Sequence, residues 1–205
     1  MRIMKLMSAG SKAVREVCPD ALVAVHFANP EKITNYESYG KNLEYYQVDY
    51  DVFASSYYPF WHGTLENLAT VLNQIADTYG KKTMIAETAY VNTDEDTDFY
   101  GNTGTDATKP YPFTEQGQAN HMRNLINTAV NDIHNCVGVF YWEGTWISVG
   151  KNSWEENSAK WEKYGSGWAS SYAADYDPND AGKWYGGCAV DNQAFFDADG
   201  KALES

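Results

Sequence analysis

The sequence has few cysteines and no long apolar run, and each of these shortages argues against a class of protein. Its three cysteines, Cys18, Cys136 and Cys188, lie far apart without CxxC spacing, so neither a zinc site nor a dense disulfide framework is indicated. No run approaches the roughly 18 apolar residues of a membrane span. Residues 1–12 lack the apolar stretch and cleavage site of a signal peptide, and their pattern predicts that the chain opens inside a helix.

Basic residues are also scarce. The 205-residue chain carries 28 acidic and 15 basic residues, a formal net charge of −13. This charge would repel phosphate backbones and anionic lipid surfaces, so we expect neither nucleic acid nor a membrane as a partner. Aromatic residues, by contrast, make up 15% of the chain, with 7 Trp and 16 Tyr, and flat apolar rings beside groups that bind hydroxyls suit sugar rings.

Hydrophobic periodicity predicts an α/β fold in which helices and buried strands alternate. Helices are expected up to about residue 17 and over 36–46, 64–80 and 114–134, and strands over 21–27, 52–58, 83–87 and 138–142. The third helix has the clearest ends, with Thr64 as N-cap, Asn67 three residues later and Gly80 as stop signal. From Ser148 onward we expect one long loop packed by its own aromatics, with a short strand or bend near 193–196.

This order of elements is typical of the second half of an eight-stranded (β/α)8 TIM barrel. Four strands are each followed by a helix or a long loop, and the leading helix has no strand before it. A complete barrel takes about 250 residues or more. We therefore expect residues 1–205 to form one partial domain that starts after strand four and ends before the final helix, with long loops after strands seven and eight.

Glu87 is the strongest candidate for chemistry, because it ends the short apolar strand 83–87. In a barrel of this kind the carboxyl ends of the strands converge on the active site. The alternative is a glutamate that merely ends a strand and meets solvent or an arginine. Other strand ends also carry side chains suited to a site, namely His26, Tyr57, Tyr58 and Trp142.

Five longer segments carry a resemblance to a known family. They are SSYYPFWHGTLENL (55–68), IAETAY (85–90), YPFTEQGQA (111–119), GVFYWEGTWISVG (138–150) and the aromatic, Gly-rich run over 170–200. Together they resemble glycoside hydrolase family 53, the endo-β-1,4-galactanases. The resemblance implies a secreted hydrolase that cleaves β-1,4-galactosidic bonds in the galactan of plant pectin and retains the configuration at the anomeric carbon.

The resemblance also implies residue functions. Glu87 matches the nucleophile, Tyr57 a residue that hydrogen-bonds it, and Trp142 a residue that stacks under the sugar. Further cleft positions are His26, Trp61, His62 and Trp146. For each of these, a core tryptophan or a structural histidine is the alternative.

A retaining glycosidase needs a second carboxylate about 5 to 5.5 Å from the nucleophile. In the family this acid/base glutamate lies in a Gly-Asn-Glu motif on strand four, which this chain does not include, and the resemblance offers no such function for Glu143. We therefore expect the chain to need the preceding half of the barrel as a partner. Alone it should be inactive and should self-associate through its open sheet edges.

The resemblance further implies one structural calcium ion between the loops after strands seven and eight. Its expected ligands are Asp96, Asp98, Tyr100, Asn102, the Cys188 carbonyl and Asp191. Alternating oxygen-bearing residues let one turn of chain present several oxygens to a hard cation. The chain departs from the family with Tyr100 in place of His and Cys188 in place of Ser. An acidic loop that is simply solvated is the alternative.

Two other functions stay open. A noncatalytic sugar-binding module would explain the aromatic residues without an acid, whereas another barrel glycosidase, such as a mannanase or a cellulase, would keep the mechanism and change the substrate. Glu87 favours an enzyme over a binding module, because a module has no reason to place a carboxylate at a strand end beside aromatic residues.

Overall fold

The computed structural model describes residues 2–102, 108–150, 153–164, 171–179 and 187–204. The chain forms two compact units. The first consists of Met1–Ala89 and Asn120–Trp142, and the second of Tyr90–Ala119 and Glu143–Ser205. The expectation of a single domain over 1–205 stays a prediction. In the described part of the chain, no helix has both the length and the apolar character needed to cross a membrane.

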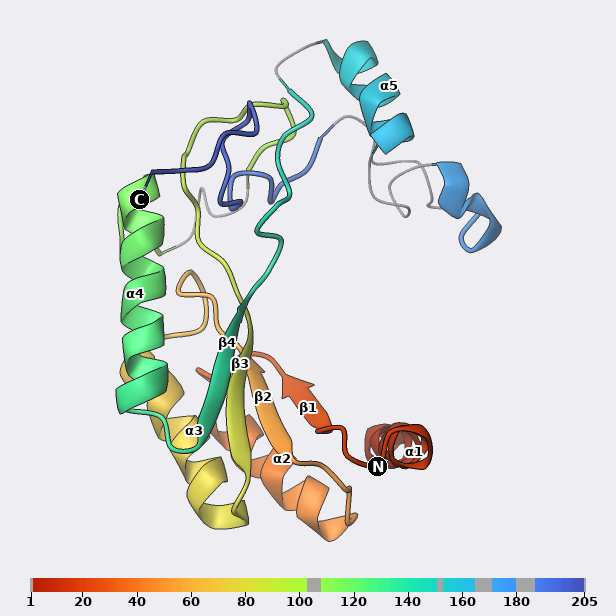
Figure 1. Ribbon diagram of the computed structural model, residues 1–205, viewed down its shortest axis with the longest axis vertical. Helices are drawn as coiled ribbons and strands as arrows, with labels where there is room; N and C mark the ends of the chain where they lie inside the picture. Colours follow the sequence, from red (N-terminus) through yellow and green to blue (C-terminus); the bar gives the residue numbers. More distant parts are fainter. Residues whose placement is uncertain (1, 103–107, 151–152, 165–170, 180–186, 205) are drawn as a thin grey trace. The chain divides into compact units, whose positions relative to one another are not determined.

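The first unit is built on a four-stranded parallel sheet in the order β1-β2-β3-β4 (Figure 1). Its elements are α1 (Arg2–Val17), β1 (Ala24–Phe27), α2 (Ile33–Tyr45), β2 (Val52–Ser56), α3 (Leu65–Tyr79), β3 (Lys82–Thr88), the C-terminal part of α4 (Glu115–Asn131) and β4 (Cys136–Tyr141). The α/β prediction is confirmed, although β1 and β2 are shorter than expected. In a parallel sheet the carboxyl ends of all strands lie at the same end of the sheet, and Glu87 lies at that end.

Local sequence signals explain the boundaries of α3. The Thr64 hydroxyl accepts a hydrogen bond from the Asn67 N–H at 3.2 Å, which satisfies one of the free amides of the first turn. Gly80 ends the helix at φ 64°, a left-handed conformation that favours glycine. Both expected signals for this helix are therefore confirmed.

The hydrophobic core of the first unit lies between the sheet and its helices. Phe53 and Ile85 from the central strands meet Leu43, Leu72 and Leu125 from α2, α3 and α4, and all five are fully buried. Burying each such side chain contributes about 1.5 to 3 kcal/mol relative to leaving it in water. Because β2 is buried along its whole length, its end is held rigidly beside that of β3.

The second unit corrects one expectation. Instead of one long loop from Ser148 onward, it contains helix α5 (Trp154–Tyr164) and a 3-10 turn, η1 (Ser171–Asp175). The signal for α5 is a capping box, in which the Glu156 N–H donates to the Ser153 hydroxyl at 3.2 Å and the Ser153 N–H donates to the Glu156 carboxylate at 3.3 Å. An isolated bridge joins Phe196 to Ala202, and Phe196 lies at the end of the region where a short strand or bend was expected.

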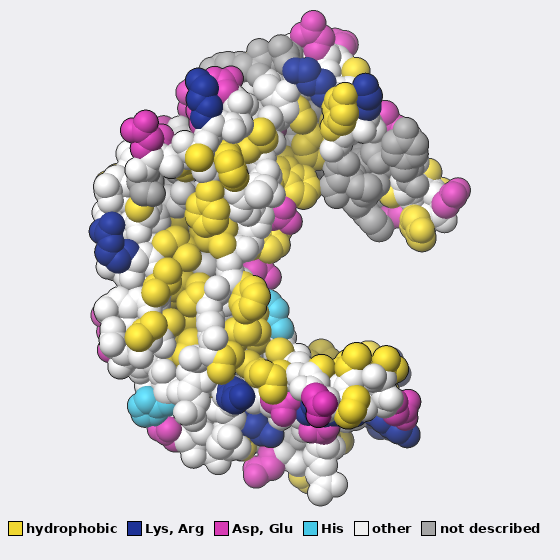
Figure 2. Space-filling model, viewed as in Figure 1, with side chains coloured by type: hydrophobic (Ala, Val, Ile, Leu, Met, Phe, Trp, Pro, Cys, Tyr) yellow, Lys and Arg dark blue, Asp and Glu magenta, His cyan; other side chains and the backbone are white. Residues whose placement is uncertain are grey.

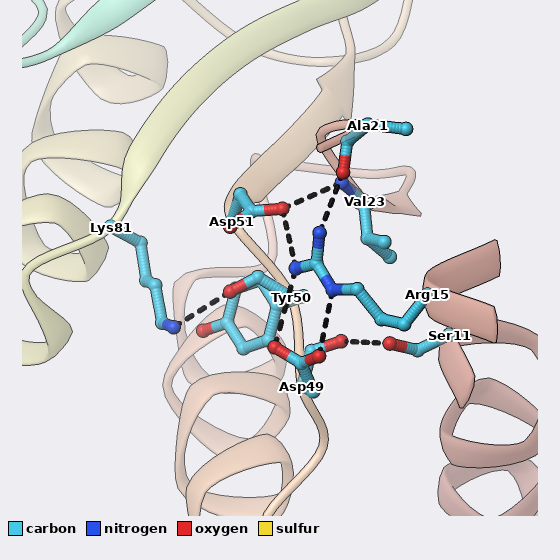
Figure 3. Close-up of polar contacts among 8 residues, drawn as sticks. All are labelled: Ser11, Arg15, Ala21, Val23, Asp49, Tyr50, Asp51 and Lys81. Atoms are coloured by element: carbon cyan, nitrogen blue, oxygen red, sulfur yellow. Dashed lines mark hydrogen bonds and ion pairs between the residues drawn. The ribbon is translucent and has the colours of Figure 1, made fainter. Parts of the chain in front are cut away.

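Arg15 ties α1 to the loop that leads into β2 (Figure 3). Its guanidinium donates to the Asp49 carboxylate at 2.9 Å, to the Asp51 carboxylate at 2.7 Å and to the Ala21 carbonyl at 2.6 Å. Asp51 also accepts the Val23 N–H at 2.7 Å. The Val23 N–H and then Arg15 lower the pKa of Asp51, and Arg15 lowers that of Asp49. One cation therefore fastens a helix and the start of two strands.

We expect Asp51→Asn to lower the free energy of unfolding at pH 7 by about 1 kcal/mol, because the amide loses the charge-assisted bond to Arg15. A carboxyl with a lowered pKa in the fold stabilises it above the unfolded pKa of about 3.9 and loses that contribution as the pH falls further. The difference from wild type should thus shrink below pH 4. Urea titrations across pH measure it, with the exposed Asp20→Asn as control. A deficit that stays constant from pH 7 to pH 3 would contradict the ion-pair account.

Both outer strands of the sheet have an open edge, since in the described residues β1 pairs with β2 alone and β4 with β3 alone. Figure 2 shows hydrophobic side chains at the surface over α4 and β4. The exposed fractions are 48% for Ile126, 74% for Val130, 49% for Val137 and 58% for Phe140. Unpaired backbone groups beside exposed apolar side chains are a template for association.

We therefore expect the chain to self-associate and Phe140→Lys to reduce this association, because a charge on an edge strand opposes pairing with another sheet. Tyr45→Lys is the matched control. It adds the same charge at an aromatic residue that is 80% exposed on α2. Sedimentation velocity measures the size distribution. Equal effects of the two variants would show that net charge, and not the edge, controls association.

Candidate active site

Glu87 lies near the carboxyl end of β3, beside the end of β2. The register between these strands shifts by one residue after Ser55, so that Ser56 lies opposite Glu87. The Tyr57 N–H then donates to the Glu87 carbonyl at 2.8 Å. Such a bulge re-aims the side chains that follow it. The irregular ladder therefore sets which residues of the 52–58 segment surround the Glu87 carboxylate, itself half-buried.

The hydroxyl that binds Glu87 belongs to Tyr58, which corrects the expectation for Tyr57. Tyr58 donates to Glu87 Oε1 at 2.7 Å, whereas the Tyr57 hydroxyl donates to the Gly63 carbonyl at 3.1 Å. The physical reason is the alternation of side chains along an extended segment, which sends neighbours to opposite faces. Tyr57 packs into the core at 2% exposure, and Tyr58 faces the carboxylate.

His26 is exposed near the end of β1, one strand further along the sheet. Its Nε2 lies 2.8 Å from the Ser56 hydroxyl. Ser56 in turn lies opposite Glu87 in the ladder, so His26, Ser56 and Glu87 follow one another across three strand ends. This contact to Ser56 had no signal in the sequence, because it depends on the register of two strands.

Two of the expected tryptophans lie at the surface of the first unit. Trp61, 51% exposed, lies in the loop after β2, with its ring centroid 6.1 Å from that of Tyr58. Trp142, 37% exposed, follows β4, and its backbone N–H donates to the Thr88 carbonyl at 2.8 Å. Neither is a core residue. Backbone hydrogen bonds hold both residues next to strand ends, and both expose aromatic surface there.

The two remaining predicted cleft residues, His62 and Trp146, do not lie at this surface. His62 is buried, at 7% exposure, and its Nδ1 accepts the backbone N–H of Tyr58 at 3.0 Å. Its side chain therefore packs inside the protein and does not line an open surface. Trp146 belongs to the second unit, where its half-buried ring lies 6.2 Å from that of Trp161 and lines a cavity with Lys160 and Tyr164.

Sequence reasoning missed His121 of α4, which lies beneath this strand end. It is 1% exposed, its Nε2 lies 3.0 Å from the Thr88 hydroxyl, and its ring stacks on Tyr57 at 6.2 Å. Burial lowers the pKa of His121 to about 4, so the imidazole is neutral at physiological pH. It therefore supports the end of β3 without adding charge beside Glu87.

The second unit contains the predicted cation ligands. Asp96 caps its own loop, because its carboxylate accepts the N–H groups of Asp98, Phe99 and Gly101 at 3.1, 2.7 and 3.2 Å. Asp98 is fully buried and accepts the Tyr100 N–H at 3.0 Å and the Cys188 N–H at 2.7 Å. The loops that carry Asp98 and Cys188 are thus joined through one carboxylate. A Cβ at Gly187 would overlap the Cβ of Tyr100, so the close approach requires glycine there.

Three oxygens near this junction are buried without a hydrogen-bond donor: both carboxylate oxygens of Asp191 and the Asn102 amide oxygen. Burial, followed by the carboxylates of Asp98 and Asp96, raises the pKa of Asp191, and the nearby Ser148 hydroxyl opposes this shift. Burial also raises the pKa of the Cys188 thiol to about 11, so Cys188 offers a carbonyl and not a thiolate. Among the described residues, no three His, Cys, Asp or Glu side chains are already gathered as metal ligands.

Comparisons with known proteins agree on one family. The family described as Glycosyl hydrolase family 53 matches residues 1–205. An endo-beta-1,4-galactanase of Bacillus subtilis (strain 168) is 56% identical over 207 residues, which cover 100% of this chain and 48% of that protein. An arabinogalactan endo-beta-1,4-galactanase of Cellvibrio japonicus is 34% identical over 167 residues, covering 75% of this chain and 43% of that protein. The chain spans about half the length of the curated relatives it matches.

Solved structures show the same relationship. The family 53 catalytic domain of Ignisphaera aggregans has a TM-score of 0.75 at 29% identity over 98% of this chain and 49% of that chain. A fungal beta-1,4-galactanase, at 19% identity and a TM-score of 0.66, supports the fold alone. With its parallel sheet and alternating helices, the chain has the fold of part of a (β/α)8 barrel. Because the family match covers the whole chain, the chain belongs to glycosyl hydrolase family 53.

Proposed function

We propose that this chain supplies the nucleophile-bearing part of a retaining endo-β-1,4-galactanase that cleaves pectic galactan. The observation that carries the proposal is the Glu87 carboxylate at the end of β3, held by the Tyr58 hydroxyl at 2.7 Å beside two exposed tryptophans. The names of the Bacillus subtilis and Cellvibrio japonicus relatives support galactan as the substrate. The proposal includes secretion, because a polymeric substrate is too large to enter a cell intact.

In this mechanism a Glu87 oxygen attacks the anomeric carbon, and the bond between that carbon and the leaving glycosidic oxygen breaks. The leaving oxygen takes a proton from a second carboxylic acid, and water activated by the same group later releases the sugar from Glu87. Tyr58 keeps one carboxylate oxygen engaged and so leaves the other to attack. We assign the second carboxylate to the part of the domain that the relatives have beyond this chain.

The two alternatives predict different behaviour. A sugar-binding module would bind galactan and release nothing, and a mannanase or cellulase would release reducing ends from another polymer. Incubation of a complete domain containing this chain with galactan, mannan and cellulose separates the three, since reducing ends should appear with galactan alone. Release from mannan or cellulose but not from galactan would overturn the substrate assignment.

Glu87→Gln tests the mechanism in the same complete domain. The amide cannot form the glycosyl ester, so we expect kcat to fall by several orders of magnitude, while galactan binding persists. Glu155→Gln, at an exposed position in α5, is the control with the same change of charge and should leave kcat unchanged. The assignment fails if Glu87→Gln keeps more than about a tenth of the wild-type turnover.

We also propose one structural calcium ion in the second unit. Asp98, Asp191 and Asn102 would hold it with their side-chain oxygens, and the Cys188 carbonyl, Asp96 and Tyr100 complete the expected set. The fit rests on the three buried oxygens without donors, because a hard cation satisfies such oxygens at about 2.3 to 2.6 Å. Bound calcium would neutralise the mutual repulsion of Asp98 and Asp191 and so join the two loops.

A ligand that binds only the folded state raises its stability by mass action. We therefore expect a calcium chelator to lower the melting temperature of wild-type protein and to have no effect on Asp98→Ala. Asp94→Ala, at an exposed position in the same loop, should respond like wild type. Identical melting curves of wild-type protein with calcium and with chelator would exclude the site.

A further inference from the structure

The loop after β2 is closed by His62, which holds both backbone polar groups of Tyr58. The Tyr58 N–H donates to His62 Nδ1 at 3.0 Å, and the His62 N–H donates back to the Tyr58 carbonyl at 2.9 Å. The Tyr57 hydroxyl donates to the carbonyl of Gly63, next along the loop. The first two bonds fix the backbone of Tyr58, whose hydroxyl donates to Glu87, and the third holds the loop beside it.

We propose that His62 is a positioning residue for the nucleophile, and that its neutral imidazole holds Tyr58 so that the tyrosine hydroxyl meets the Glu87 carboxylate. The inference deepens the proposed function and rests on it for the function of Glu87. The claim that His62 positions Tyr58, and Tyr58 positions Glu87, rests on the hydrogen bonds alone. A nucleophile must be held to within a few tenths of an ångström, which requires supporting residues that are themselves locked.

Burial argues against a direct sugar contact by His62. Its side chain is 7% exposed, whereas its neighbour Trp61 is 51% exposed. The His62 ring also lies edge-on to the Tyr58 ring, with centroids 5.7 Å apart and planes at 70°. His62 therefore supports Tyr58 through both backbone and ring, while Trp61 presents the loop's open aromatic face.

The bond from Tyr58 N–H requires one protonation state. A backbone N–H can only donate, so Nδ1 must be the unprotonated nitrogen, and a doubly protonated ring cannot accept. Burial lowers the pKa of His62 and so favours the accepting form. The carboxylates of Glu31 and Glu87 and the Ser56 backbone act the other way, and Lys32 adds to the lowering. Neutral His62 is thus available at physiological pH, and the bond is lost when acid protonates the ring.

Two amide substitutions at His62 test whether the hydrogen bond from the Tyr58 N–H matters, or only the packing of the side chain. His62→Asn places an amide oxygen at the position of Nδ1, accepts at every pH and cannot titrate. His62→Gln carries the same amide one bond further out, near the position of Nε2, and removes the acceptor. The pair therefore differs in where the acceptor lies, with the chemical group held constant.

The measurement is amide hydrogen exchange by NMR on the full 205-residue chain. The readout is the protection factor of the Tyr58 amide. The protection factor of the Phe53 amide, in the core of β2, is the internal control for folding. We expect Tyr58 protection in wild type to fall about tenfold as acid protonates His62, the size of effect that one hydrogen bond supplies. His62→Asn should keep protection across the same pH range, and His62→Gln should lack it throughout. Equal Tyr58 protection in His62→Gln and wild type, with Phe53 unchanged, would overturn the proposal.

A second readout follows the effect to the nucleophile. The 13C shift of the Glu87 carboxyl carbon reports its bond from Tyr58, which Tyr58→Phe removes. We expect His62→Gln to move this shift toward that of Tyr58→Phe, and His62→Asn to leave it at the wild-type value. A wild-type shift in His62→Gln would sink the inference. Both readouts are independent of turnover, so a failed galactanase assay would overturn the proposed function and leave these results standing.

Discussion

The pairing of β2 with β3 is the constraint on which the candidate site depends. Both strands lie in the middle of the sheet and are fastened by buried residues of three helices, so their carboxyl ends cannot shift independently. The one-residue register shift after Ser55 is the only irregularity in this ladder as far as the described pairs show, and it decides the neighbours of Glu87. With regular pairing, Ser56 would face Ala86, and the residues that follow would be turned to the other face.

Two buried histidines near this strand end are neutral at physiological pH. His62 and His121 are both buried, and burial lowers the pKa of each, so neither brings a positive charge to Glu87 at physiological pH. Tyr58 contributes a neutral hydroxyl. A fixed cation would stabilise the Glu87 carboxylate and weaken it as a nucleophile, and neither buried histidine supplies one.

In the second unit, by contrast, buried carboxylates lie close together. Asp98 and Asp191 are both buried, and two oxygens of Asp191 have no donor. Such an arrangement costs stability unless a proton or a cation compensates it. Burial and the neighbouring carboxylates raise the pKa of Asp191, and the proposed calcium ion would compensate the buried charge and also join the Asp98 loop to the Cys188 segment.

The sequence by itself determined the α/β class, the ends of α3 and the position of Glu87 at a strand end, because these depend on periodicity, capping residues and the length of a short apolar run. It also contained the capping box of α5, which sequence analysis overlooked within an aromatic, polar segment. Only the tertiary structure decided that Tyr58 and not Tyr57 binds Glu87, that His62 faces the Tyr58 backbone, and that Ser56 bridges toward His26. These contacts depend on a register shift between two strands and on hydrogen bonds across the sheet, and a local sequence pattern carries no information on either.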